Sequence, residues 1–387
     1  MNEQAINADS RDIFKALMAI FVMAFTAGLA IGAAMPLISM SMEIRGMSAA
    51  HIGYVVAAAP LGLICASPFI GTMVNRAGLL GAMALGGIVV TLTLAIMPSI
   101  FGVTPWVICR FISGLGMAAI WILSETWVNA LATDKNRGRL VAGFMITMAT
   151  GFGMGPIMIT FIGVESWLPY YLAAGIFAIS LIPLYIARDV APTLPASEGW
   201  SFGQAFKTAP LLMIIALFAG VTDATQISFY PVYAVREGFD ANTALYMLTA
   251  IVVGSLLIQF PIGLFADKFG RNIPLAVFLL LTIVFGGMIP FVLYNPLIIW
   301  PVLVLWGGVA FGLYTLCIIV LGDRFDAAGL AGANAALVAM YELGSVTGPV
   351  AVGHAMDRFG PDGLPMVLVL SGIPVVVYFV IRRVIRR

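Results

Sequence analysis

Residues 263–271 read Gly-Leu-Phe-Ala-Asp-Lys-Phe-Gly-Arg, and they close an apolar run that begins at residue 243. A related stretch, Gly-Thr-Met-Val-Asn-Arg-Ala-Gly, occupies residues 71–78, so its first glycine recurs after 192 residues (from 71 to 263). A different motif, Gly-x-x-x-Gly-Pro, begins at residue 151 and again 193 residues later (from 151 to 344). Two unrelated motifs at nearly the same spacing indicate that the chain contains two copies of one structural unit.

The chain is rich in apolar residues and poor in charged ones. Of its 387 residues, 61% are hydrophobic and 10% are charged, and the mean hydropathy is +1.06. Soluble domains carry about 25% charged residues, and a single soluble chain exposes too much surface to hide this much apolar area. The composition therefore predicts a protein that folds in a lipid bilayer. A net charge of +1 and the lack of a basic tract give no reason to expect nucleic acid as a partner.

Twelve apolar runs are long enough to cross a bilayer, which takes about 20 residues. Their edges are defined to within a few residues, and the runs are 14–38, 52–74, 79–99, 106–128, 140–162, 168–187, 209–233, 243–265, 272–293, 297–320, 332–353 and 363–381. The sequence predicts an all-α membrane protein with twelve transmembrane helices in two pseudo-symmetric six-helix bundles. We expect residues 1–187 to form the first bundle, 188–208 a cytoplasmic linker and 209–387 the second bundle.

Basic residues are distributed unevenly among the predicted connections. If both termini face the cytoplasm, fifteen of the 19 Lys and Arg residues lie in inner segments, and Arg110 lies within a span. The remaining three, in outer loops, are Arg45, Arg236 and Arg358. Lys and Arg accumulate on the cytoplasmic side of membrane proteins. The bias predicts a multi-pass protein of the inner (plasma) membrane with both termini in the cytoplasm, and the polar first thirteen residues do not resemble a cleaved signal peptide.

These motifs resemble those of the major facilitator superfamily. Residues 263–271 resemble its signature between the second and third spans of a half, and Arg110-x-x-x-Gly-x-Gly in span 4 resembles a second motif. The motif at residues 151–156 partly resembles one associated with proton-coupled exporters, although residues 158–160 lack the paired glycines of that motif. The stretches 110–140 and 261–271 are similar to the YcaD-type branch. The resemblance implies the major facilitator fold and secondary transport by alternating access.

The resemblance also implies a latch on the cytoplasmic side. In the superfamily, the acid at the position of Asp267 meets the start of a helix in the other half, which by pseudo-symmetry is span 5. A carboxylate there can accept hydrogen bonds from free helix N–H groups and oppose the helix dipole. We expect Asp267 to pair with Arg137 or Arg139, with Arg271 at the end of the same motif. Tight turns with solvated charges remain the alternative.

The first half departs from this pattern. Asn75 stands where the acid is expected, followed by Arg76, and residues 327–335 at the start of span 11 carry no charge. Both sides of the second latch are neutral together. We therefore expect one charged latch and one that is only polar.

Apart from Lys15 at the very edge of the first run, four charged residues lie within predicted spans, where each costs about 2.5–3.5 kcal/mol at the membrane centre. A rise of about 1.5 Å per residue places Asp223 and Glu342 near the midplane, and Arg110 and Glu125 nearer the ends of span 4. We expect Asp223 and Glu342 to carry a coupling proton. Arg110 is expected to assist, because the resemblance links its position to proton coupling. A purely structural role stays open for these residues. Asp223 could bond to neighbouring hydroxyls, a protonated Glu342 could bridge two helices, and Arg110 could bond to carbonyls of neighbouring helices.

A polar segment surrounds Asp223, and Pro231 is expected to interrupt the helix just after it. A broken polar helix is tolerated in a membrane only where it lines a cavity. Asp223, Gln226 and Tyr230 share one helix face at about 100° per residue, so we expect this face to contact the substrate. Further residues expected at the substrate are Trp121, Glu125, Tyr341 and Gln259. For Glu125, a simple interfacial role stays open.

The repeated glycine motif has the spacing of close helix contacts. Small residues four apart allow two helix backbones to approach in a membrane. We expect helix packing at these positions, with a hinge role secondary; the residues are Gly151, Gly155, Pro156, Gly344, Gly348 and Pro349.

No phosphate-binding loop, nucleophile–base pair or metal-ligand spacing appears in the sequence. We therefore expect neither an enzyme nor a protein with a cofactor or metal. The sequence predicts a monomeric, proton-coupled secondary transporter of a small neutral or cationic amphipathic solute, with export by antiport favoured. A proton-driven uptake symporter for a small nutrient or vitamin is the alternative. A non-transporting membrane sensor or scaffold has no support from the sequence.

Overall fold

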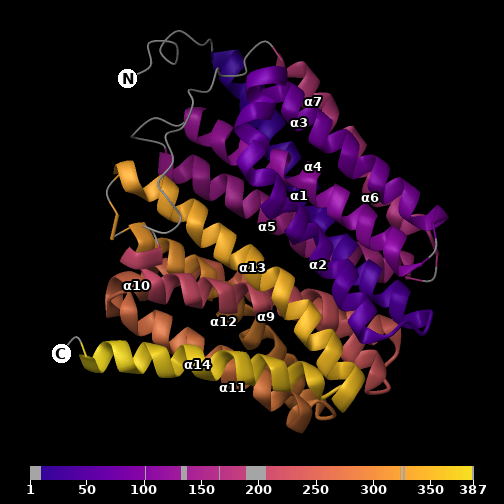
Figure 1. Cartoon of the computed structure of the whole chain (residues 1–387), viewed down its shortest axis with the longest axis vertical. Coiled ribbons are helices and arrows are strands. Elements are labelled where there is room, and N and C mark those ends of the chain that lie inside the picture. Colours follow the sequence, from indigo (N-terminus) through magenta and orange to yellow (C-terminus); the bar gives the residue numbers. More distant parts are fainter. Residues whose placement is uncertain are drawn as a thin grey trace. The chain divides into compact units, whose positions relative to one another are not determined.

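The computed structural model describes residues 10–100, 102–131, 137–164, 166–188, 206–322, 324–325 and 327–385. Its helices, labelled in Figure 1, are α1 (Ser10–Ile44), α2 (Ala49–Ala66), α3 (Ile70–Ile96), α4 (Val103–Leu131), α5 (Arg137–Ile162), α6 (Leu168–Ile179), α7 (Leu181–Ile186), α9 (Pro210–Arg236), α10 (Ala241–Phe269), α11 (Asn272–Val292), α12 (Pro296–Gly322), α13 (Ala327–Phe359) and α14 (Gly363–Ile385), with 3-10 turns η2 (Ser67–Phe69) and η3 (Met97–Ser99). No strand occurs within these described ranges.

Eleven stretches of the described chain are long and apolar enough to cross a membrane. One of them, Ala49–Ser99, holds two of the twelve predicted runs, because α2, η2 and α3 follow one another without a gap. Each of the other ten corresponds to one predicted run. The spans are helices because a helix satisfies every backbone polar group within its own segment, as a bilayer requires.

Two glycines at corresponding places end a span and turn the chain into the next. Gly78 has φ 71° and breaks the helical path inside α3, and Gly270 has φ 73° between α10 and α11. Positive φ at these values is strained for residues with a Cβ. The two turns are 192 residues apart (from 78 to 270), so the repeat seen in the sequence is also a repeat of backbone conformation.

The chain forms two compact units. One comprises Met1–Leu37 and Ala58–Ala196, and the other comprises Ile38–Ala57 and Ser197–Arg387. These units differ from the bundles expected from the sequence in the segment Ile38–Ala57, which packs with the second unit. The end of α1 and the start of α2 therefore belong to a different compact unit from the rest of those two helices. The expected boundaries of the two bundles, 1–187 and 209–387, stay a prediction.

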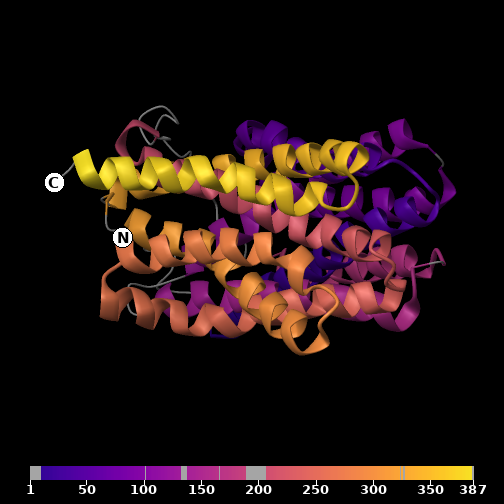
Figure 2. The same ribbon diagram turned by 90° about the horizontal axis from the view of Figure 1, so that it is seen from below.

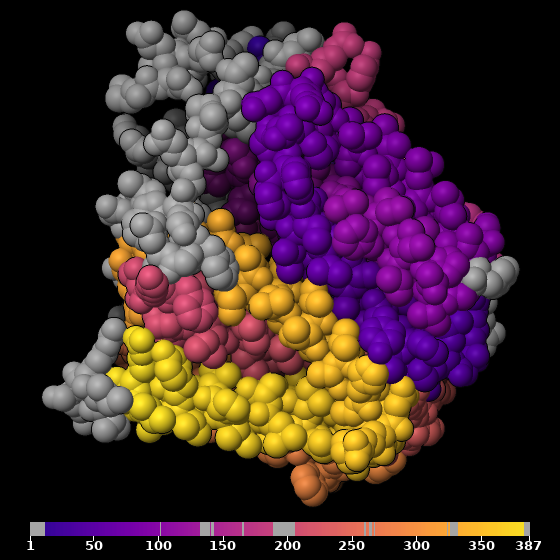
Figure 3. Space-filling view, in the orientation of Figure 1, coloured from indigo at the N-terminus to yellow at the C-terminus, as the bar shows by residue number. Residues whose placement is uncertain are grey.

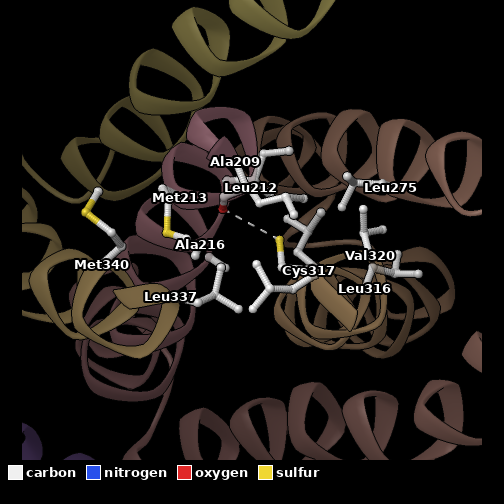
Figure 4. Packing of buried hydrophobic residues seen from close by; sticks show 14 of the residues in the cluster. Ala209, Leu212, Met213, Ala216, Leu275, Leu316, Cys317, Val320, Leu337 and Met340 are labelled. Carbon is white, nitrogen blue, oxygen red and sulfur yellow. Dashed lines mark hydrogen bonds between the residues drawn. The ribbon is translucent and has the colours of Figure 1, made fainter. Parts of the chain in front are cut away.

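Each unit has an apolar core made by several helices. In the first, buried side chains come from α1, α3, α4, α5 and α7, with Trp127 and Phe144 among the largest. In the second, α9, α11, α12 and α13 meet around Cys317, whose Sγ lies 3.9 Å from the carbonyl oxygen of Leu212 (Figure 4). Side chains from these four helices interdigitate in that view, among them Met213, Ala216, Leu275, Leu316, Leu337 and Met340.

The glycines of the repeated motif lie directly against a neighbouring helix. A Cβ at either glycine of α5 would overlap with the backbone of α1, and a Cβ at either glycine of α13 would approach the backbone of α9 closer than carbon atoms normally do. In each pair, the residues in contact belong to a single unit. The prolines that follow do not end their helices. The residues concerned are Gly151, Gly155 and Pro156 in α5, and Gly344, Gly348 and Pro349 in α13.

The surface of the second unit carries large apolar side chains along its outer helices. α14 runs along the face shown in Figure 3, in yellow, and Figure 2 shows it from below beside other helices of its unit. Its exposed residues Leu370, Ile373 and Val377 recur at helical spacing, so they form one apolar stripe. A stripe of this kind is what a helix presents to lipid.

Candidate functional site

The polar segment of α9 is buried within the second unit. Residues 222–228 include two threonines, an aspartate, a glutamine and a serine, and each of these five side chains is at most 1% exposed. Burying polar groups in an apolar environment costs free energy unless they find hydrogen-bond partners. Where each side chain finds its partner therefore decides whether the segment is structural or is available to a ligand.

Asp223 is held by a single described hydrogen bond. The phenol Oη of Tyr341 in α13 donates to its Oδ2 at 3.1 Å, across 118 residues of sequence. The two helices are close here because Gly220 of α9 lies against the backbone of Tyr341, and a Cβ at that glycine would overlap with the carbonyl oxygen. The glycine thus sets the separation at which a tyrosine can reach this aspartate.

Other polar atoms of the segment have no partner in the described part of the chain. They are Oδ1 of Asp223, both amide atoms of Gln226 and Oγ of Ser228. An unpartnered buried polar group costs about 1–3 kcal/mol. Nearly all such groups in folded proteins are satisfied by protein or ordered water. Several on one segment are therefore available to a bound solute or water.

The neighbouring hydroxyls do not bond to Asp223. Thr222 Oγ1 donates to the carbonyl oxygen of Phe218 at 2.9 Å, and Thr225 Oγ1 donates to that of Val221 at 2.7 Å. Both bonds stay within α9. The structural alternative, an aspartate stabilised by the hydroxyls beside it, is not the arrangement seen here.

Aromatic rings surround the same part of the second unit. Tyr341 packs on Tyr314 with ring centroids 4.6 Å apart. Tyr230 lies against Tyr233 at 5.9 Å and edge-on to Trp306 at 6.0 Å. The Tyr230 hydroxyl contacts the sulfur of Met247 at 3.8 Å. These rings provide apolar faces next to unpartnered polar atoms.

The expected break at Pro231 is wrong. α9 continues from Pro210 to Arg236 with Pro231 inside it. Proline removes one backbone donor but fixes φ near the helical value. In a membrane, neighbouring groups can satisfy the freed carbonyl, so the helix continues.

The remaining predicted charges lie in both units. Glu342 follows Tyr341 in α13 and is half-buried in the second unit. Arg110 of α4 is buried in the first unit, and its Nε has no partner among the described residues. Trp121 and Glu125, also on α4, are half-buried.

Comparison with known proteins places this architecture in one family. The model of the Major Facilitator Superfamily matches residues 20–349. The chain belongs to the Major Facilitator Superfamily. This membership confirms the resemblance found in the sequence motifs, and with it the all-α fold of twelve transmembrane helices and the broad class of membrane transporter.

Two relatives and one solved structure show how near the likeness is. The uncharacterized MFS-type transporter YfkF of Bacillus subtilis is 27% identical over 341 residues, which is 86% of each chain. The uncharacterized MFS-type transporter YcaD of Escherichia coli is 24% identical over 347 residues, which is 89% of each chain. The crystal structure of the nucleoside transporter NupG (D323A mutant) superposes with a TM-score of 0.80 at 13% identity, covering 94% of this chain and 99% of that one. At that identity, the likeness establishes the fold alone.

The superfamily latch falls mostly outside what the structure describes. The side chains of Asp267, Arg137 and Arg139 are outside the described set, as is that of Gln259. Arg271 donates from Nη1 to the carbonyl oxygen of Ile319 in α12 at 2.9 Å. In the first half, Asn75 and Arg76 are exposed in the turn before Gly78. The charged latch therefore stays a prediction.

One group of charged residues did not emerge from the sequence. Glu43, Arg236 and Asp357 come together within the second unit. A signal was present, because residues 357–360 read Asp-Arg-Phe-Gly and residues 267–270 read Asp-Lys-Phe-Gly. The two stretches are 90 residues apart (from 267 to 357), so a comparison of the two halves at the 192-residue spacing does not align them.

Proposed function

We propose that this transporter is a proton-coupled exporter of a small neutral or cationic amphipathic solute. It works by antiport and alternating access in the inner (plasma) membrane. The observation that carries the proposal is the state of Asp223 in α9. Its carboxyl is 1% exposed, Oδ2 accepts one hydrogen bond, and Oδ1 has no partner in the described chain.

A carboxyl in this state favours binding of a proton or of a cationic donor. Burying an ionised carboxylate in a low-dielectric environment is costly unless it is paired. Either a proton or a cationic group of the solute relieves that cost, and the two compete for one oxygen pair. Competition of this kind is what exchange of a proton for a solute requires. Gln226, three residues further along α9, offers an amide donor and acceptor to the same solute.

Two further charges support the assignment. Glu342 lies next to Tyr341, so a second carboxyl is close along the chain to the residue that bonds Asp223. Arg110 is a buried charge in α4, and charges inside a membrane span are rare and mark transport or proton pathways. We assign Asp223 and Glu342 to proton coupling, with Arg110 assisting from the first unit.

Substrate class and direction follow from chemistry and from a motif. Acids in α9 and α13 disfavour polyanions, and the rings of Tyr314 and Tyr341 suit a flat apolar group. Export is favoured by the Gly-x-x-x-Gly-Pro motif of α5. A nucleoside, the substrate class named for NupG, belongs in any panel of test solutes because it is flat and neutral.

The test is proton flux driven by solutes in proteoliposomes. Purified protein is reconstituted with a pH-sensitive dye inside, and a panel of cationic aromatic solutes and neutral nucleosides is added outside. A solute of antiport moves protons opposite to itself, whereas a symport solute moves them in the same direction. The direction of the dye signal therefore separates export from uptake.

The matched control is Asp362→Asn, since Asp362 is an exposed acid at the start of α14. Solute-driven flux that survives in both Asp223→Asn and Glu342→Gln would show that the coupling assignment is wrong. Absence of flux for every solute in the wild-type protein would favour a non-transporting role.

A further inference from the structure

An Asp-basic-Phe-Gly element occurs twice at helix ends. Residues 267–270 end α10 and residues 357–360 end α13. In both, the glycine takes a positive φ, 73° at Gly270 and 71° at Gly360, and the aspartate precedes it by three residues. In the predicted topology, α10 ends on the cytoplasmic side and α13 on the outer side. The same local device is therefore expected at opposite faces of the membrane.

The second copy holds the start of α2. Asp357 Oδ1 accepts a hydrogen bond from the backbone N–H of Ala49 at 2.8 Å, and Oδ2 accepts one from Ala50 at 2.9 Å. These are two of the N–H groups that a helix start leaves without a partner within the helix. The carboxylate also opposes the positive end of the helix dipole. The family resemblance implies a similar contact with a helix start for Asp267 on the cytoplasmic side.

An ion pair completes the arrangement. Arg236 at the end of α9 donates from Nε and Nη2 to the two carboxylate oxygens of Glu43 in α1, both at 2.8 Å. Its Nη1 lies 4.0 Å from Oδ1 of Asp357. The three side chains are 21%, 13% and 32% exposed, respectively. A two-pronged Arg–carboxylate pair is directional as well as attractive, so it depends on the relative position of the two helices.

The helix backbones touch beside these charges. A Cβ at Gly353 of α13 would overlap with the carbonyl oxygen of Ala49. A Cβ at Gly53 of α2 would overlap with the carbonyl oxygen of Pro349. In the residues that directly follow these two glycines, Tyr54 Oη and His354 Nε2 are 2.8 Å apart. All of these residues belong to the second unit.

We propose that Asp357, Arg236 and Glu43 form an outer latch, which ties α1 and α2 to α9 and α13 and opens once in each transport cycle. The inference rests on the proposed alternating-access function. Glu43 and the start of α2 come from the first repeat of the sequence, and Arg236 and Asp357 come from the second. Alternating access separates the two repeats at each face in turn. Contacts that are polar, partly solvated and dependent on geometry are suited to break and re-form.

The test measures the separation of α2 and α13 by cross-linking and needs no solute. In a background where Cys65, Cys109 and Cys317 are replaced by serine, Tyr54→Cys and His354→Cys are introduced and joined by a short bis-maleimide. Asp357→Asn and Arg236→Gln should each lower the cross-linking rate roughly fivefold, as expected for losing a helix-start or ion-pair contact. Arg358→Gln is the control, because this exposed neighbour makes no ion pair among the described residues.

Charge exchange and salt give independent readouts. Glu43→Arg combined with Arg236→Glu should recover only part of the cross-linking rate that Arg236→Gln loses, because the exchange restores the pair between positions 43 and 236 but not the attraction of position 236 to Asp357. With all three latch residues intact, raising the salt from about 0.05 M to about 1 M should lower the rate, because salt screens partly exposed charges. Rates that stay unchanged in the variants and with salt would show a static contact and overturn the latch. Since no solute takes part, a failed proton-flux experiment does not affect this result.

Discussion

The phenol of Tyr341 in α13 donates a hydrogen bond of 3.1 Å to the carboxyl of Asp223 in α9. Gly220 and Gly344 lie between the same two helices, and neither has room for a Cβ. The bond is therefore a product of how closely α9 and α13 approach. It ties the state of one buried carboxyl to the position of a second helix.

Asp223→Asn should abolish solute-driven proton movement while the protein still folds. Asparagine keeps the size and the acceptor oxygen for Tyr341 but cannot carry a proton. Proton flux in proteoliposomes measures the loss, and binding of the solute followed by fluorescence measures what remains. A cationic solute should bind at least tenfold more weakly, since a charged hydrogen bond contributes about 1.5–3 kcal/mol. Full coupling in this variant would contradict the proposal.

Tyr341→Phe should leave the fold intact and alter transport less than Asp223→Asn does. The substitution removes one hydroxyl, so Asp223 loses its described donor while the ring can still pack on Tyr314. A loss of roughly tenfold in transport rate corresponds to one charge-assisted hydrogen bond. We expect the pH profile of transport to shift, because the donor stabilises the ionised carboxyl. Tyr314→Phe keeps that donor and should leave the pH profile unchanged.

Gly344→Val should strongly reduce the yield and thermal stability of the detergent-purified protein. A Cβ at this position would overlap with the carbonyl oxygen of Leu217, so α9 and α13 would be forced apart. Gly175→Ala is the matched control, because Gly175 is exposed in α6 and has nothing within 4 Å of an added Cβ. That variant should be neutral or up to about 1 kcal/mol more stable, because alanine is the better helix former. Equal thermal stability of the two variants would contradict close packing.

Asp240→Ala should lower stability at neutral pH but have little effect in acid. The Thr243 hydroxyl and the backbone N–H groups of Thr243 and Asn242 donate to Asp240, and these bonds lower the pKa of its carboxyl. A lowered pKa gives stability that is present above the unfolded value of about 3.9 and lost as the pH falls through the folded pKa. The loss at pH 7 should be about 1 kcal/mol, as for other helix caps.

Thermal unfolding of wild type and Asp240→Ala, compared at neutral pH and below the folded pKa, checks this prediction. Asp240→Ser is the conservative variant, because serine can still accept from a helix N–H. It should retain part of the stability at neutral pH. A wild-type advantage that persists undiminished in strong acid would rule out the ionised cap as its source.

The sequence alone determined the spans, their number and the duplication. Each membrane helix must be apolar and satisfy its own backbone hydrogen bonds, so that information is local and can be read from one run at a time. The turns at Gly78 and Gly270 are likewise local, since positive φ is a property of a single residue. The same locality made Asp223 stand out as a charge in an apolar run.

Only the tertiary structure decided the partners of these residues. Tyr341 lies 118 residues from Asp223, and Ala49 lies 308 residues from Asp357. Such contacts depend on which helix faces pack together, and glycine contacts at Gly220 and Gly53 set that geometry. Local patterns also misjudged Pro231, because the cost of a proline depends on what surrounds the helix. The length of an apolar span can be counted along the sequence. The partner of a buried charge depends instead on how segments that are distant in the sequence pack together.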